Sequence, residues 1–233
     1  MSRVDKSTIP PVTYDNQIIP LVSSVKDLGL HIDSDLDWRS QVTHISKKVT
    51  GTLRSLYRLR KFLPPKTKVM LIRTLVFPII DYGDVCYLDL NADLLNKLDR
   101  LLNNCIRFVF NLRKYDHVSS FRRELNWLPI RQRRSLHTLS LLYSLLNSNN
   151  TPKYLSSDFR YLCSTHNSNL RSSNNLLLNC PRHSSSLVHS SFHMQAILLW
   201  NALPLEIRRS KSRKKFKFRV HQLYFDLVVA NNT

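Results

Sequence analysis

One long amphipathic helix constrains this chain more than any other feature. Between Trp38 and Leu63, apolar residues recur every three or four positions, which is the spacing of one face of an α-helix. Asp35 and Asp37 precede the segment, where a carboxylate can accept hydrogen bonds from the free N–H groups of a first turn. A Pro-Pro pair follows it and ends it. We therefore predict a helix over residues 38–63 with one buried stripe. The stripe consists of Trp38, Val42, Ile45, Val49, Leu53, Leu56, Leu59 and Leu63.

The other flank of this helix is cationic and contains no carboxylate. Its basic residues are Arg39, His44, Lys47, Lys48, Arg54, Arg58, Arg60 and Lys61. Over the whole chain, 35 Lys and Arg residues stand against 16 Asp and Glu residues, a formal charge of +19. Folding does not need this excess, whereas a polyanionic partner does, with nucleic acid as the first candidate and an anionic membrane as the second. A merely solvated basic face is the alternative.

The small number of glycines and the spacing of the cysteines exclude some classes of protein. The three glycines cannot make a phosphate-cradling glycine loop, and their scarcity disfavours a turn-dense all-β fold. The four cysteines are scattered and the N-terminus lacks an apolar signal segment, which predicts a reducing, intracellular compartment, nuclear or cytoplasmic. The most apolar run, Val69 to Ile80, is broken by Arg73 and is too short to cross a bilayer. We expect no membrane as a partner.

The remaining pattern predicts a mainly α fold with a short β element at its start. Near the N-terminus, Asp15-Asn16 is a plausible hairpin turn, and Val25 to Ile32 alternates like a single strand. Helical spacing returns at about 66–87, with a kink at Pro78, and then at 91–112, 119–125 and 129–146. We expect four parts: an extended part (1–37), a helical bundle (38–147), a Ser/Asn-rich, mostly irregular linker (148–190) and a basic C-terminal module (191–233) that packs on the bundle or trails from it.

Two further groups of cations belong to the predicted binding surface. One group crowds the first turn of the helix that follows Pro129, the unfavourable end of a helix dipole for positive charge. The other lies in a C-terminal basic run in which Phe216 and Phe218 interleave with the charges. The candidate nucleic-acid-binding residues are Lys47, Lys48, Arg54, Arg58, Arg60, Lys61, Arg131, Arg133, Arg134, Arg213, Lys214 and Lys215.

Two acidic groups fall short of a catalytic or metal site. Asp33, Asp35 and Asp37 begin like a calcium loop, but Trp38 and His44 occupy the places of its required glycine and glutamate. The run from Asp81 to Asp84, Asp-Tyr-Gly-Asp, is similar to the Tyr-x-Asp-Asp of polymerases, yet no second acidic cluster supports two metal ions. We predict no catalytic residue and no cofactor.

Two Cys-x-x-His pairs could form a tetrahedral zinc site. They are Cys163 with His166 and Cys180 with His183. Both pairs lie in the Ser/Asn-rich segment, and Pro181 interrupts the second. We therefore predict that no structural zinc is bound.

Five short segments follow one another in a characteristic order. They are Val25–Asp33 with Leu36-Asp37-Trp38, Leu71–Gly83, Leu98–Val109 with Asn104, Ile106 and Arg107, Trp127–Ile130 with Arg133, and Phe192–Ile207 with Phe216-Lys217. In this order they resemble the C-terminal part of jockey-like non-LTR retrotransposon reverse transcriptases, which are RNA-directed DNA polymerases. In that family the first segment closes the palm and enters the thumb. The resemblance implies that residues 1–37 are a remnant of the palm sheet and that 38–147 form a thumb-like bundle. It also implies an apolar role for Cys180.

The resemblance carries an expectation about function. A thumb of this family holds the template–primer duplex by its backbone, which needs cations and no base-reading geometry. The fingers and the catalytic palm find no counterpart here, so we expect a non-catalytic fragment without polymerase activity. It would bind RNA or an RNA–DNA hybrid non-specifically, with a separate polymerase catalytic part as a further candidate partner. A helical protein–protein scaffold and an inert gene fragment remain as alternatives.

Overall fold

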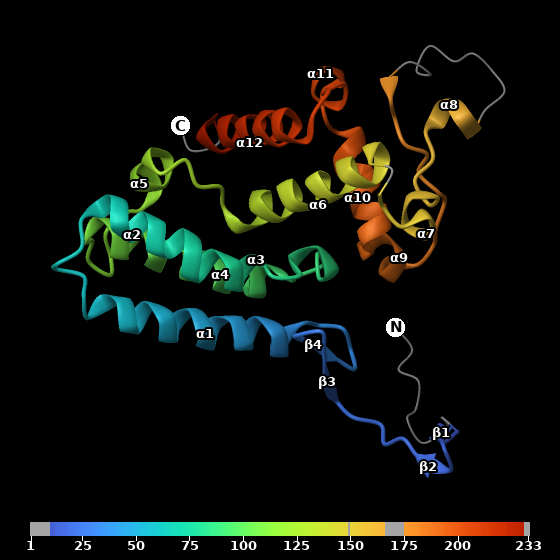
Figure 1. Cartoon of the computed structure of the whole chain (residues 1–233), viewed down its shortest axis with the longest axis horizontal. Coiled ribbons are helices and arrows are strands. Elements are labelled where there is room, and N and C mark those ends of the chain that lie inside the picture. Colours follow the sequence, from blue (N-terminus) through green and yellow to red (C-terminus); the bar gives the residue numbers. More distant parts are fainter. Residues whose placement is uncertain (1–9, 149, 166–174, 231–233) are drawn as a thin grey trace.

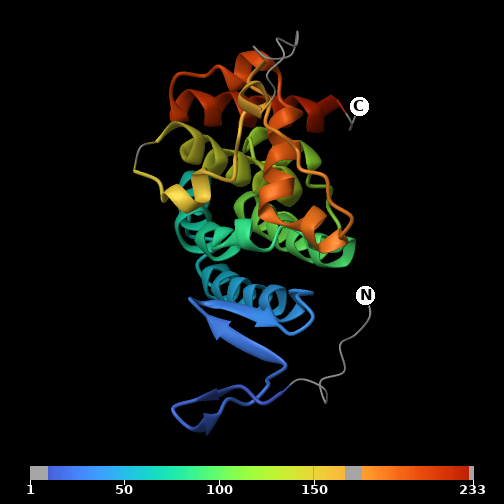
Figure 2. The ribbon, with the colours of Figure 1, turned by 90° about the vertical axis from the view of Figure 1, so that its right-hand side faces the viewer.

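The structure, a computed structural model, describes residues 10–148, 150–165 and 175–230. It is mainly α-helical, with two small β-hairpins at the N-terminal end (Figure 1). The helices are stacked in layers that follow the chain: α1 lies at one side of the molecule, α2 to α4 lie next, and α6 and α12 follow (Figures 1 and 2). The predicted fold class is confirmed.

The two hairpins differ in how well the sequence predicted them. β1 (Thr13–Tyr14) and β2 (Gln17–Ile18) pair around the predicted Asp15-Asn16 turn, whose residues both adopt positive φ. The single strand expected over residues 25–32 is wrong. The segment folds back as β3 (Ser24–Asp27) and β4 (Leu30–Asp33), with φ of 43° at Leu28 and 87° at Gly29. Glycine adopts such a φ without strain and so permits the reversal.

Helix α1 (Arg39–Tyr57) confirms the buried stripe and corrects its length. The side chains of Val42, Ile45, Val49, Leu53 and Leu56 are buried as expected. The helix ends six residues before Leu63, and Leu59 is 52% exposed in the turns that follow. Leu63 still packs against the core from this turn region.

Carboxylates hold the start of α1, as the sequence predicted in part. Asp37 Oδ1 accepts a hydrogen bond from the N–H of Arg39 at 3.1 Å. The N–H of Ser40 donates to Asp33 Oδ2 at 3.2 Å, so Asp33 takes the role expected of Asp35. Burial opposes ionisation of Asp33, but its hydrogen bonds with Ser40, Asp37 and Ser24 together outweigh burial and lower the pKa of this carboxyl group.

The second helical segment contains an irregular turn before its proline. α2 (Pro65–Leu71) continues into a π-helical turn over Ile72–Val76 and then into α3 (Phe77–Asp81). Proline has no N–H and its ring crowds the carbonyl four residues earlier, so the wider turn accommodates Pro78 without ending the helix. The segment stops at Asp81 rather than near Tyr87, because the chain turns at Gly83, which has φ of 61°.

The next helices agree with the prediction to within a few residues. α4 (Ala92–Phe110) begins at Asn91, whose side chain accepts the N–H of Leu94 at 2.9 Å, and ends at Asn111 with φ of 59°. α5 (Ser119–Glu124) and α6 (Ile130–Asn147) follow, the latter directly after Pro129.

The described residues form two apolar cores, and α6 contributes to both. The first lies among α1, α2, α3 and α4 and includes Ile130 from the start of α6. The second joins Leu136, Leu139 and Leu142 of α6 to the C-terminal helices. These are α10 (Phe192–Asn201), α11 (Leu205–Arg208) and α12 (Arg213–Ala230). The C-terminal module therefore packs on the helical bundle, and most of α6 shares a core with that module rather than with α1.

The Ser/Asn-rich segment is more ordered than the sequence predicted. Its described part contains α7 (Lys153–Ser156), α8 (Leu162–Thr165) and α9 (Ser186–Ser190). Tyr161 and Leu178 form an isolated β-bridge, and both Phe159 and Leu178 are buried in the second core. Most of its described backbone is irregular, as predicted, but Phe159 and Leu178 anchor it to the second core.

Candidate nucleic-acid interface

The outer face of α1 and the turn after it carry cations without acidic partners. Within residues 10–148, 150–165 and 175–230, the ion pairs are Arg39–Asp37, Arg133–Asp81 and His137–Asp84. None of them involves the exposed cations that we call the α1 cations. The α1 cations are Lys47, Lys48, Arg54, Arg58 and Lys61. Their charge is therefore balanced by solvent ions or by a partner.

Helical geometry places three of these charges on one line. Lys47, Arg54 and Arg58 are separated by seven and four residues, so they share a side of the helix opposite the stripe of Val42, Ile45 and Val49. Among the described elements, no other helix lies beyond α1 on this side of the molecule, and the nearest elements there are the β-hairpins (Figures 1 and 2). The line is thus open to a long, flat partner.

A groove continues the cationic surface toward the β3–β4 hairpin. It has a volume of about 340 Å³ and lies between the hairpin, α1 and α3, with Lys26, His44 and Lys48 in its lining. Burial lowers the pKa of His44, and the neighbouring charges of His31, Lys48, Lys26 and Lys47 lower it further. An anion in this groove would be favoured by the same charges.

Arg60 faces inward and performs a structural task. Its Nε donates to Asn111 Oδ1 at 2.8 Å, and its Nη2 donates to the carbonyls of Arg107 and Leu112 at 3.2 Å. The carbonyl of Arg107 also accepts the backbone N–H groups of Asn111 and Leu112, so Arg60 adds a further hydrogen bond to the turn that ends α4. The prediction that Arg60 contacts phosphates is therefore replaced by a role in closing α4.

The three arginines at the start of α6 have different surroundings. Arg131 is exposed. Arg133 forms a bidentate ion pair with Asp81 of α3, with Nε 2.6 Å from Oδ1, and its guanidinium lies 4.1 Å from the ring centre of Phe77. Because Asp81 pairs with the edge of this guanidinium and Phe77 lies against its face, Arg133 is withdrawn from the predicted binding surface.

Arg134 is buried between the two cores. It is 5% exposed, its Nη2 donates to the carbonyls of Asp84 (2.9 Å) and Tyr87, and its guanidinium lies 4.4 Å from the ring centre of Tyr87. Burial lowers its pKa, although the nearby Tyr87 and Asp84 favour the charged form. The unfavourable charge at the start of α6 thus has a structural reason. The sequence carried one signal for it, namely the acidic pair Asp81 and Asp84 in a turn.

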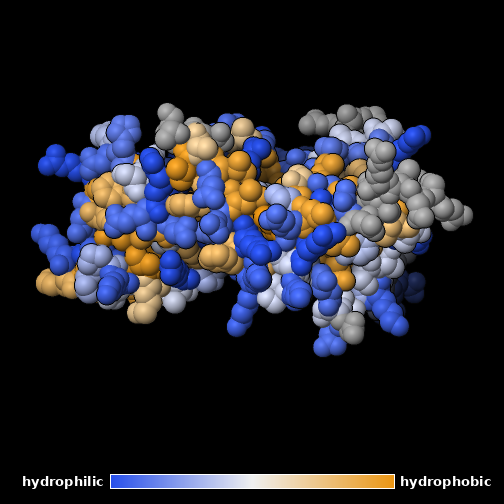
Figure 3. All heavy atoms as spheres, turned by 90° about the horizontal axis from the view of Figure 1, so that it is seen from above, coloured by the Kyte–Doolittle hydropathy of each residue, from blue (hydrophilic) through white to orange (hydrophobic). Residues whose placement is uncertain are grey.

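The C-terminal cations lie away from α1. Arg213, Lys214 and Lys215 are exposed in the first turn of α12, which lies on the opposite side of the molecule from α1 (Figures 1 and 2). Hydrophilic and hydrophobic side chains are intermixed on the face seen from this side (Figure 3). These cations therefore form a second surface and do not extend that of α1.

The two phenylalanines of the basic run, Phe216 and Phe218, lie in different environments. Phe216 is buried, with its ring centre 4.5 Å from that of Tyr143 and 5.7 Å from that of Trp200. Phe218 is 68% exposed. The interleaving that the sequence showed is therefore a helix with one core residue and one surface residue.

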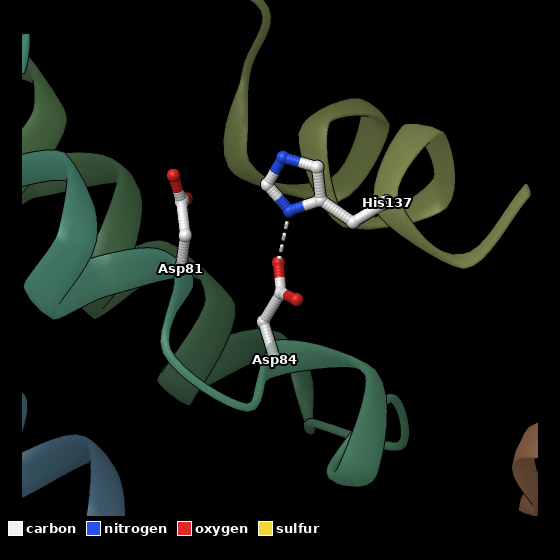
Figure 4. Close-up of side chains that lie close together, drawn as sticks. All are labelled: Asp81, Asp84 and His137. Carbon is white, nitrogen blue, oxygen red and sulfur yellow. Dashed lines mark hydrogen bonds and ion pairs between the residues drawn. The ribbon is translucent and has the colours of Figure 1, made fainter. Parts of the chain in front are cut away.

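Asp81, Asp84 and His137 form a cluster that sequence reasoning missed. One ligand atom from each lies within 4.8 Å of the others, and His137 Nδ1 is 2.6 Å from Asp84 Oδ2 (Figure 4). Two guanidinium groups, those of Arg133 and Arg134, already contact this region. Because their positive charge opposes a divalent cation, we assign the cluster to the connection between α3 and α6 rather than to metal binding or catalysis.

The described members of the two Cys-x-x-His pairs do not form a group of metal ligands. Cys163 and Cys180 are exposed, and Nε2 of His183 is 3.2 Å from Nδ1 of His189. In the described part of the chain, no group of three metal-binding side chains includes these residues. His166 lies outside the described residues. The exposure of Cys180 also contradicts the apolar role that the family resemblance implied.

The fold and the surface define a mainly α-helical protein with an open cationic face. No protein-family model matches the chain, and neither a curated protein nor a solved structure does. None of the helices in the described ranges is both long and apolar enough to cross a membrane.

Proposed function

We propose that the chain binds RNA or an RNA–DNA hybrid through its phosphate backbone, without sequence preference and without catalysing DNA synthesis. The observation that carries this proposal is the exposure of the α1 cations on a side of the helix that has no carboxylate. The ordered resemblance of five segments to a reverse-transcriptase thumb supports the same assignment, and a separate polymerase catalytic part would then be a partner.

The dimensions of α1 suit a phosphate backbone. The eleven helical steps from Lys47 to Arg58 extend over roughly 16 Å along the helix axis. One strand of a duplex presents a phosphate about every 3.4 Å of axis, so the line of cations spans roughly five phosphates. Lys and Arg contacts of this kind release counterions and fix the position of a duplex while carrying no sequence information.

The test is a variant in which Lys47→Gln, Lys48→Gln and Arg54→Gln are combined. We expect weaker binding of every hybrid duplex regardless of sequence. The plot of log affinity against log salt should flatten by about two units, because each lost phosphate contact removes roughly 0.7–0.9. The melting temperature should hardly change, since these side chains are exposed. Fluorescence anisotropy at several salt concentrations and thermal unfolding measure both quantities.

A second variant separates local contacts from the overall charge. Arg123→Gln, Lys153→Gln and Arg160→Gln remove three exposed cations from α5, α7 and the loop after α7. We expect this variant to keep most of the affinity. If the α1 variant and this control bind equally well and with the unaltered salt slope, the α1 cations are only a solvated face and the protein-scaffold alternative gains support.

A further inference from the structure

Gly51 lies in the middle of α1 and has no internal reason to be a glycine. The other two glycines, Gly29 and Gly83, have positive φ values of 87° and 61°, which explain them. Gly51 is helical and exposed, and a Cβ atom added there would meet no atom within 4 Å. Glycine inside a helix is unfavourable relative to alanine, because it loses more backbone freedom on folding. The fold therefore carries a local cost that its own packing does not explain.

The position of Gly51 coincides with the line of cations. Lys47 precedes it by four residues, and Arg54 and Arg58 follow it by three and seven, so all four share one side of the helix. The missing side chain leaves a notch in this line, with an exposed cation on either side. Lys48 lies three residues before Gly51 in α1. It also lines the groove of about 340 Å³ beside the β3–β4 hairpin.

We propose that Gly51 is the point at which a nucleic-acid phosphodiester backbone comes closest to α1. This inference rests on the proposed function and specifies where the partner crosses the helix. Without a Cβ at residue 51, a strand can approach the helix backbone, and the flanking Lys47 and Arg54 then reach phosphates on either side of the crossing. Coulomb attraction rises as distance falls, so the close approach strengthens both contacts. The backbone N–H of Gly51 stays in the helix, and the glycine acts through shape alone.

The test uses Gly51→Ala and Gly51→Leu. Both should stabilise the fold, with a melting temperature raised by about 2–4 °C, because both residues favour a helix and the space is open. Both should nevertheless weaken binding of an RNA–DNA hybrid, with the dissociation constant raised roughly threefold for alanine and roughly tenfold or more for leucine. A higher stability together with a lower affinity is a combination that a purely structural role of Gly51 does not produce.

A control places the same side chain on another exposed helix position. Asn104→Leu in α4 should also raise the melting temperature and should leave the dissociation constant unchanged. If Gly51→Leu binds like the unmodified chain while the triple Gln variant of α1 binds weakly, the proposed function stands and the inference about Gly51 is overturned. If neither variant weakens binding, both are overturned. A lower melting temperature for Gly51→Ala would reveal an internal role for the glycine and would also overturn the inference.

Discussion

Arg134 shows how a single side chain can be misjudged from its charge. Arg134 and Arg131 lie one helical turn apart or less, but Arg134 is buried against Tyr87 while Arg131 is exposed. A buried guanidinium needs acceptors in place of water, and here the carbonyls of Asp84 and Tyr87 accept from Nη2, whereas Nη1 is buried without a hydrogen-bond partner. The same residue type therefore has a structural role at one position and remains available to a partner at the other.

Replacing Arg134 tests this distinction. For Arg134→Gln we expect a loss of about 2–4 kcal/mol in the free energy of unfolding, because the substitution leaves buried carbonyls without a donor. Arg131→Gln should change this free energy by about 0.5 kcal/mol or less. Chemical denaturation measures both values. An unchanged stability for Arg134→Gln, together with weaker duplex binding, would restore Arg134 to the interface.

At the scale of elements, Asn111 joins two helical segments. It ends α4 in a left-handed conformation, and its Oδ1 accepts hydrogen bonds from Arg60 Nε and Lys68 Nζ, both at 2.8 Å. Lys68 is 1% exposed, and burial, followed by the charge of Arg60, lowers the pKa of its ammonium group. The amide oxygen of Asn111 thus accepts hydrogen bonds from two cations, Arg60 after α1 and Lys68 in α2.

Two substitutions of Asn111 separate its backbone and side-chain contributions. Asn111→Gly keeps the left-handed conformation but removes the acceptor, so we expect a loss of about 1–3 kcal/mol in the free energy of unfolding. Asn111→Ala should cost about 1–2 kcal/mol more, because alanine also opposes this conformation.

The partner of this amide supplies the control. Adding Lys68→Met to Asn111→Gly should recover part of the loss, since the double change removes a buried charge that has lost its acceptor. Denaturant unfolding of Asn111→Gly, of Lys68→Met and of the double variant gives the free energies for a double-mutant cycle. Strict additivity would mean that Lys68 and Asn111 do not depend on each other.

At the scale of the whole molecule, α6 links the two cores. Its first residue, Ile130, is buried with α1, α3 and α4, and Leu139 is buried with α10 and α12. Loss of one core would leave the corresponding half of α6 without its tertiary packing, which is the main source of stability for a helix in a protein. The two cores are therefore expected to unfold together.

One substitution in each core tests this coupling. Leu102→Ala in the first core and Leu139→Ala in the second should each cost about 2–5 kcal/mol, because both side chains are almost fully buried. Each variant should still unfold in one transition that far-UV and near-UV circular dichroism report at the same temperature. Two separate transitions in either variant would show that the cores fold independently.

The sequence by itself determined the long helices of the bundle and which face of α1 is buried, but not the short helices α7, α8 and α9. Apolar spacing is a local property, so the stripe from Val42 to Leu56 needed no knowledge of its neighbours. Local chemistry likewise predicted the Asp15-Asn16 turn and the helix start after Pro129. The resemblance to a reverse-transcriptase thumb and the binding it implies stay predictions.

Only the tertiary structure decided what each cation does. Arg60, Arg133 and Arg134 find their acceptors about fifty residues away along the chain, and such distant contacts leave no periodic trace in the sequence. The same holds for the membership of α6 in two cores. A positively charged side chain needs hydrogen-bond acceptors from the protein, from a partner or from water. Whether the protein or a partner supplies that acceptor depends on which segments the fold brings together.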